Sequence, residues 1–84
     1  GKGELGRGDL TASGVNWIAG APPAGPVRAA AQIRHRHREA PGRLTPHGDD
    51  RAEMLFDEPQ TAVTPGQAVV FYDGDAVIGG GWID

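Results

Sequence analysis

The sequence has 84 residues, 38% of them hydrophobic, which is enough for one small domain with one modest core. It contains no cysteine, so disulfides, thiolate metal sites and thiol-based catalysis or sulfur relay are excluded within this segment. No apolar run approaches the roughly 20 residues of a membrane span, and we expect a soluble, cytoplasmic domain.

Charge is distributed unevenly along the chain, although the net charge is only −3. Residues 27–43 carry five arginines and one acid, a net charge of +4, whereas residues 44–84 carry one arginine and eight acids, a net charge of −7. Residues 1–26 are balanced. The net charge argues against indiscriminate nucleic-acid binding, and the uneven distribution predicts a basic and an acidic side.

The composition predicts an all-β fold, because fourteen glycines and seven prolines leave little room for long helices. Proline and glycine clusters divide the chain into about six short apolar runs, as expected of a small closed or partly open barrel or a sandwich. Residues 1–12 begin with Gly1 and are polar and glycine-rich, so we interpret them as a flexible N-terminal segment at a cut within a longer protein. Residues 13–84 form the predicted folded domain.

The first predicted strand is short, at residues 15–18, and a loop rich in proline and glycine follows it. Residues 27–37 alternate, with apolar side chains and two histidines on one face and polar side chains on the other. The polar face and the residue after it form a stripe of arginines: Arg28, Arg34, Arg36 and Arg38.

A weak strand at residues 42–45 and a second strand at 51–56 form a predicted hairpin around a turn at 46–50. Asp57 and the residues after it are expected to end the second strand. The side chains expected to face the core from this strand are Ala52, Met54 and Phe56.

Residues 64–66 place proline and glycine at the central positions of a type II turn. The strongest predicted strand follows at 67–72, and residues 73–75 are typical of a tight hairpin turn into a last strand at 76–83. The glycine triplet at 79–81 predicts a bulge or a close backbone approach.

The arginine stripe is the main functional signal that the residues alone provide. Side chains on alternate strand positions lie about 6.6–7 Å apart, close to the spacing of successive phosphates, so the stripe suits a polynucleotide backbone. The alternative is a solvated edge strand whose charges prevent aggregation, and composition alone favours this alternative.

Metal binding is a weak possibility. His35 and His37 share a predicted strand face, and His47 could add a third ligand. Histidines that lie at a barrel rim or supplement the arginines are the preferred interpretation, so no metal site is predicted.

No catalytic residue is predicted in this chain. Ser13 has no histidine nearby in sequence, and the glycine triplet lacks the Lys-Ser/Thr of a phosphate loop. Trp17 and Trp82 are both assigned to core packing. Three pairs of acids are interpreted as turn residues rather than catalytic carboxylates; they are Asp49 and Asp50, Asp57 and Glu58, and Asp73 and Asp75.

Five segments together resemble the C-terminal end of the tRNA-specific 2-thiouridylases. They are VNWI at 15–18, IRHRH at 33–37, FDEPQ at 56–60, AVTPGQAVVFYDGD at 62–75 and GGG at 79–81. Their order and spacing match throughout residues 15–84, and the combination is specific although each piece alone is weak.

The resemblance implies that residues 13–84 are a C-terminal β-barrel domain, of the kind seen in translation-factor second domains. In this family the barrel is appended to an ATP-pyrophosphatase-type catalytic domain and a small central domain. The full enzyme adenylates the 2-oxygen of the wobble uridine with ATP and Mg²⁺, then replaces it with sulfur from a cysteine persulfide. The resemblance places these steps upstream, so no cofactor is expected in this domain.

The implied partners are tRNA, the catalytic and central domains of the same protein, and a sulfur-carrier protein as a further candidate. The family's tRNA contacts align with Arg34, His35 and Gln67; Arg36 and Arg38 are added from the stripe. Histidine replaces the usual tyrosine at position 35, where imidazole can still stack or donate a hydrogen bond. Strict alternation turns His35 inward, and a bulge would reconcile the two predictions.

The predicted function is therefore a tRNA-positioning domain of an enzyme that 2-thiolates the wobble uridine, without catalysis by this chain itself. The alternative is a structural or protein-docking barrel that supports the catalytic domain or binds a sulfur carrier through the acidic half of the chain.

Overall fold

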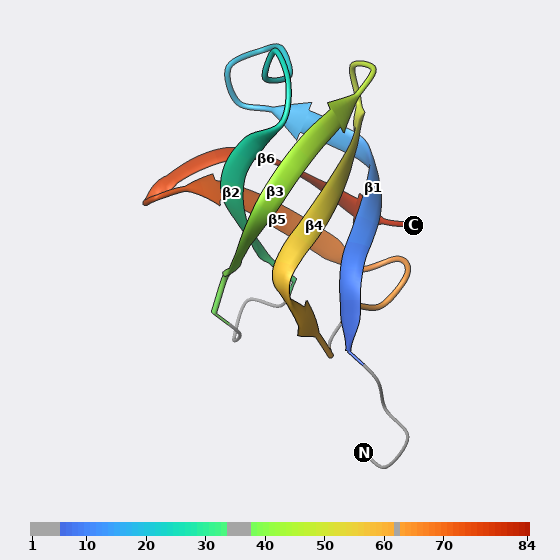
Figure 1. Ribbon diagram of the computed structural model, residues 1–84. Coiled ribbons are helices and arrows are strands. Elements are labelled where there is room, and N and C mark those ends of the chain that lie inside the picture. Colours follow the sequence, from blue (N-terminus) through green and yellow to red (C-terminus); the bar gives the residue numbers. More distant parts are fainter. Residues whose placement is uncertain (1–5, 34–37, 62) are drawn as a thin grey trace.

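A computed structural model of the chain contains six strands that close into an antiparallel barrel in the order β1-β4-β3-β2-β5-β6 (Figure 1). The structure describes residues 6–33, 38–61 and 63–84. No helix in these residues is long and apolar enough to cross a membrane. The prediction of an all-β barrel of about six strands is confirmed. The strands are β1 (Arg7–Trp17), β2 (Val27–Gln32), β3 (Ala40–His47), β4 (Arg51–Gln60), β5 (Ala68–Asp73) and β6 (Ala76–Ile83).

The first strand begins at Arg7, well before the short strand predicted at residues 15–18. Leu10 and Ala12 in its first half have no exposed surface, because alternate side chains point into the barrel. This half pairs with β4, whereas the second half pairs with β6. The folded domain therefore includes residues 7–12, which we predicted to belong to a flexible N-terminal segment.

The inward face of β2 agrees with the predicted alternation, since Ala29 and Ala31 are buried. The strand itself is shorter than predicted and ends at Gln32. Arg38 follows in the connection to β3 and is not a strand residue. A continuous strand that carries the whole arginine stripe is therefore not present in the described residues.

The β3–β4 hairpin is confirmed, and the three side chains predicted to face the core from β4 are all buried. The strand continues to Gln60, because its last residues pair with Arg7 at the start of β1. Asp57 and Glu58 are consequently strand residues, and their assignment to a turn was wrong.

The type II turn before β5 is confirmed by its geometry. The backbone N–H of Gln67 donates to the carbonyl of Thr64 at 3.2 Å, and Gly66 has a φ of 89°. The close backbone approach predicted for the glycine triplet is also present. A Cβ atom at Gly81 would lie 2.8 Å from the carbonyl oxygen of Ser13, so a side chain there would force β6 away from β1.

The two tryptophans differ in environment. Trp17 is buried, stacks on Phe71 with ring centroids 6.4 Å apart, and donates its indole N–H to the carbonyl of Asp49 at 2.9 Å. Trp82 is 58% exposed, so its assignment to the core was wrong. It lies on the outward side of β6, immediately before the buried Ile83.

Candidate nucleic-acid interface

Two of the residues proposed to contact tRNA, Arg38 and Gln67, are among the described residues, and they lie at one end of the barrel. β2 and β5 are antiparallel neighbours, and Gln32 at the end of β2 is opposite Val70 near the start of β5. The chain leaves β2 at this end, and it also enters β5 from this end. Arg38 and Gln67 are therefore both located at the end of the barrel where β2 finishes.

Gln67 is held in place by its backbone. Its carbonyl accepts a hydrogen bond from the N–H of Ile83 at 2.8 Å, and the adjacent Gly66 N–H donates to the carbonyl of Ile83 at 2.7 Å. These bonds connect the turn to the last residues of β6. The side chain of Gln67 is thus presented from a fixed backbone position.

The amide of Gln67 has an unmet hydrogen-bonding requirement. Its Oε1 is buried and has no partner, and it is the single such side-chain atom among residues 6–33, 38–61 and 63–84. A buried acceptor without a donor costs about 1–3 kcal/mol. A ligand that offers a donor to this oxygen would remove that cost.

Arg38 is exposed, and acidic residues lie around it. It lines a hollow of about 310 Å³ together with Glu39, Asp57, Glu58 and Gln60. Its positive charge therefore acts within a locally acidic part of the surface.

The other three residues proposed to bind tRNA are Arg34, His35 and Arg36. They lie outside the described residues, as does His37. The bulge proposed for His35 lies there too, and these assignments remain predictions.

Arg28, the first arginine of the stripe, already forms an ion pair on the barrel surface. Its guanidinium donates to both carboxylate oxygens of Asp57, at 2.8 and 2.5 Å. This hydrogen bonding raises the pKa of Arg28 and lowers the pKa of Asp57 from their ordinary values. Arg28 is therefore not free to bind phosphate unless it leaves Asp57.

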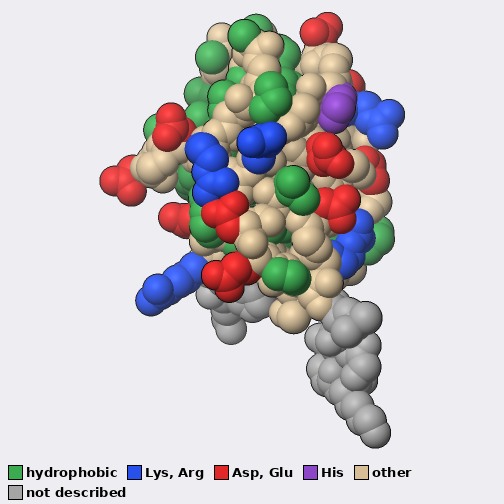
Figure 2. Space-filling view, in the orientation of Figure 1, with side chains coloured by type: hydrophobic (Ala, Val, Ile, Leu, Met, Phe, Trp, Pro, Cys, Tyr) green, Lys and Arg blue, Asp and Glu red, His purple; other side chains and the backbone are tan. Residues whose placement is uncertain are grey.

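Basic and acidic side chains are mixed on the surface rather than separated. Arg51 lies 3.9 Å from Asp84, and hydrogen bonds from Ser13 and Thr11, with the charge of Arg51, lower the pKa of Asp84. Figure 2 shows Arg side chains among Asp and Glu side chains over the β1, β3 and β4 side. The prediction of one basic and one acidic side is wrong for this face, because the acidic β4 lies beside the basic β3.

Among the described residues, no group of three or more His, Asp or Glu side chains could hold a metal ion. His47 lies 3.9 Å from Glu53, a distance that suits a weak ion pair when the imidazole is protonated. The other two histidines lie outside the described residues.

These features define a small closed β-barrel domain. Residues 7–83 match the aminomethyltransferase beta-barrel domain family. The chain belongs to this family.

Curated relatives of the chain carry the name tRNA-specific 2-thiouridylase MnmA. The protein of Solibacter usitatus is 58% identical over 87 residues, which cover 100% of this chain and 24% of the relative. The protein of Syntrophotalea carbinolica is 57% identical over 88% of this chain and 21% of the relative, and that of Koribacter versatilis 54% over 95% and 22%. The chain therefore spans less than a quarter of the length of these relatives, and the resemblance to 2-thiouridylases is confirmed.

Proposed function

We propose that this domain binds and positions tRNA for a 2-thiolation reaction that other domains of a longer protein catalyse. The relatives are named as tRNA-specific enzymes, and the chain matches only a small part of each. The observation that carries the proposal is the buried, unpaired Oε1 of Gln67 at the barrel end that also holds Arg38. ATP and Mg²⁺ would be needed by the other domains, not by this one.

The chemistry of Gln67 suits RNA. A glutamine amide offers both an acceptor and donors, and an RNA strand presents a 2′-hydroxyl at every nucleotide. The side chain as a whole is only half-buried, so a ligand at this surface can contact the amide group. Exchange of an unpaired buried state for a hydrogen-bonded one favours the complex.

The contribution of such a domain to catalysis would be orientation. Binding energy from groups remote from the reacting uridine can hold the uridine in place without contact with it. Contacts to phosphate and sugar fix register and orientation but carry little sequence information. We therefore expect the domain to raise affinity for tRNA generally rather than to select one sequence.

The test uses a chimera in which this chain replaces the matching segment of the Solibacter usitatus relative. Unmodified tRNA is titrated by filter binding at several salt concentrations. The double variant Arg38→Ala and Gln67→Ala should bind about tenfold more weakly, equivalent to roughly 1.4 kcal/mol. The slope of log K against log salt should also become shallower by about 1, because one phosphate contact is lost.

Arg43→Ala is the matched control, because it removes the same charge from the middle of β3, where its cross-strand partners are Arg28 and Leu55. It should leave the affinity within about twofold of the parent chimera. Arg34→Ala, His35→Ala and Arg36→Ala test the three proposed contacts outside the described residues in the same assay. Parent-like affinity in all of the site variants would disprove the proposal.

A further inference from the structure

Charged residues are absent from three long segments of this chain. Residues 10–27, 59–72 and 76–83 contain no Lys, Arg, Asp or Glu. The first segment forms most of β1 and the connection to β2, the second leads into β5, and the third forms β6. This distribution separates a charged part of the barrel from an uncharged part.

The fold places the uncharged segments side by side. β6 pairs with β5 on one side and with the second half of β1 on the other. β5 and β6 cross behind β3 and β4 in Figure 1, on the side away from the charged surface drawn in Figure 2. The barrel therefore has one charged side and one uncharged side.

Large apolar side chains are exposed on the uncharged side. Ile18, directly after β1, is 64% exposed, and Val77 on β6 is 43% exposed. Trp82 also lies on β6. The indole of Trp82 lies over Gly14, where an added Cβ would be 3.4 Å from its Cδ1. We call these exposed residues, with the half-buried side chains beside them, the neutral face: Ile18, Val70, Tyr72, Val77 and Trp82.

One more large apolar residue among those described is exposed, and it provides a comparison. Leu55 is 54% exposed, but it lies on β4 with Arg43 and Asp9 as its cross-strand partners. A single apolar residue among charges is ordinary for a protein surface. Several exposed apolar residues that lie together without charged neighbours mark an interaction site.

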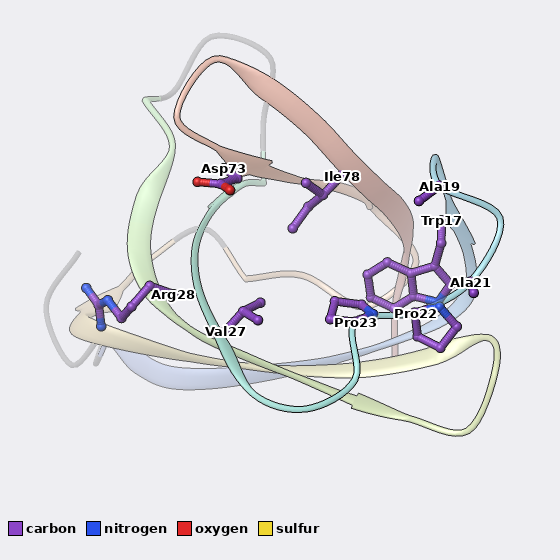
Figure 3. A pocket seen from close by; sticks show the side chains of 9 residues that line it. All are labelled: Trp17, Ala19, Ala21, Pro22, Pro23, Val27, Arg28, Asp73 and Ile78. Atoms are coloured by element: carbon purple, nitrogen blue, oxygen red, sulfur yellow. The ribbon is translucent and has the colours of Figure 1, made fainter.

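A mainly apolar hollow extends the neutral face at the end of the barrel opposite Gln67. The hollow has a volume of about 280 Å³, and Trp17, Pro23, Val27 and Ile78 line most of it. Two charged residues, Arg28 and Asp73, also lie in its wall. Figure 3 shows Val27 and Ile78 on opposite sides of this hollow, with the proline and tryptophan rings at its other end. An apolar side chain of a partner would fit there.

We infer that the neutral face docks against an apolar, uncharged surface on the remaining part of the longer polypeptide in which this domain family occurs. The matching segment covers only 21–24% of the relatives, so most of each relative lies outside it and is covalently linked to it. Permanent interfaces are depleted in charge at their centres, as this face is. A linked surface is also present at an effective concentration in the millimolar range.

RNA is a poorer occupant of this face. Lys and Arg supply the electrostatic affinity for a phosphate backbone, and residues 10–27, 59–72 and 76–83 contain neither. The charged residues at the ends of β5 and β6 are acids, namely Asp73, Asp75 and Asp84. The inference rests on the length of the relatives and on surface chemistry, and it stands whether or not Gln67 binds tRNA.

The test uses the absence of cysteine from this chain. Val77→Cys places a thiol on the neutral face, and Leu55→Cys is a control of similar exposure on the charged side. Maleimide labelling of each cysteine is followed by peptide-resolved mass spectrometry, in the 84-residue chain and in the chimera with the Solibacter usitatus relative. Labelling at position 77 should be at least tenfold slower in the chimera, and labelling at position 55 should change less than twofold.

Three other results would each overturn the inference. Equal labelling of position 77 in the chain and the chimera would show that the face stays open. Protection that occurs only after addition of unmodified tRNA would assign the face to RNA. Protection in the 84-residue chain that grows with its concentration would assign it to a second copy. Far-ultraviolet circular dichroism and the thermal midpoint of each variant show that the barrel is folded during labelling.

Discussion

Arg28 on β2 reaches across β3 and binds both carboxylate oxygens of Asp57 on β4. The two residues are 29 positions apart in the sequence, and the strand order β4-β3-β2 brings them together. A bidentate arginine–carboxylate pair has a fixed geometry, so it constrains the relative position of three strands. It also removes one arginine from the set available to a nucleic acid.

The first prediction concerns the pH dependence of this pair. Hydrogen bonding from Arg28 lowers the pKa of Asp57 below its ordinary value of 3.8. A carboxylate with a lowered folded-state pKa stabilises the fold above its unfolded-state pKa, and this stabilisation is lost as the pH falls through the folded value. Asp57→Asn should therefore lower the thermal midpoint at about pH 7 and have little effect near pH 2.

Asp75→Asn, at the turn between β5 and β6, is the control for that experiment. It removes an exposed carboxylate for which no hydrogen bond or ion pair is observed, so the midpoint should change little at either pH. Thermal denaturation followed by circular dichroism measures both variants. An equal loss for Asp57→Asn at both pH values would show that the ion pair is not the source of the effect.

The second prediction concerns Gly42, which is buried in β3. A Cβ atom there would collide with the backbone carbonyl of Leu55 and lie 2.9 Å from the Cα of Phe56. Gly42→Ala should destabilise the barrel by about 3 kcal/mol or more, because backbone on the neighbouring strand cannot move as a side chain can. Gly8→Ala in β1 has no atom within 4 Å of the added Cβ and should be nearly neutral. Urea unfolding of the two variants gives the comparison, and similar stabilities would contradict the packing argument.

Local patterns were sufficient to predict much of the fold. The alternation in β4 predicts its buried face from three side chains, because period-two alternation depends only on neighbours in sequence. Thr64-Pro65-Gly66 predicts its turn for the same reason, since Gly66 alone supplies the positive φ. The outward position of Trp82 was not predictable in this way. It depends on register shifts between β1 and β6 and between β5 and β6, and a shift of one residue reverses the face of every later side chain.

The candidate site was predictable only in part. Gln67 follows a local turn and could be placed from sequence, whereas the pairing of Arg28 with Asp57 depends on which strands become neighbours. The neutral face did have a signal in the sequence, namely the three uncharged segments. Net charge summed over residues 1–26, 27–43 and 44–84 hides that signal, because the uncharged residues 59–72 and 76–83 fall in the same range as the acids of β4.

The third prediction separates the two tryptophans by stability and by fluorescence. Trp17→Ala should cost about 3–5 kcal/mol, because it removes a buried ring that stacks on Phe71. Trp82→Ala should cost less than about 1 kcal/mol, since its side chain is largely in solvent. Acrylamide should quench most of the emission of the 84-residue chain, and Trp82→Phe should leave a blue-shifted, poorly quenched spectrum. Strong quenching in Trp82→Phe would show that Trp17 is accessible.

The fourth prediction is that one substitution at Gln67 changes stability and tRNA affinity in opposite directions. Methionine has nearly the same shape as glutamine but no buried acceptor that needs a donor. Gln67→Met should therefore stabilise the barrel by about 1 kcal/mol in urea unfolding. The same change should weaken tRNA binding by the chimera severalfold, because methionine cannot replace the proposed hydrogen bond.

The two measurements on Gln67→Met distinguish a binding residue from a structural one. Replacement of a residue that stabilises the fold makes the protein less stable. Any loss of binding then follows from the damaged fold. A residue retained for a ligand can be a source of instability in the free protein, since its polar group is satisfied only in the complex. A more stable barrel with weaker tRNA binding would assign Gln67 to the ligand. A less stable barrel would show that the amide oxygen has a partner within the fold, and the argument for RNA at this end of the barrel would lose its main support.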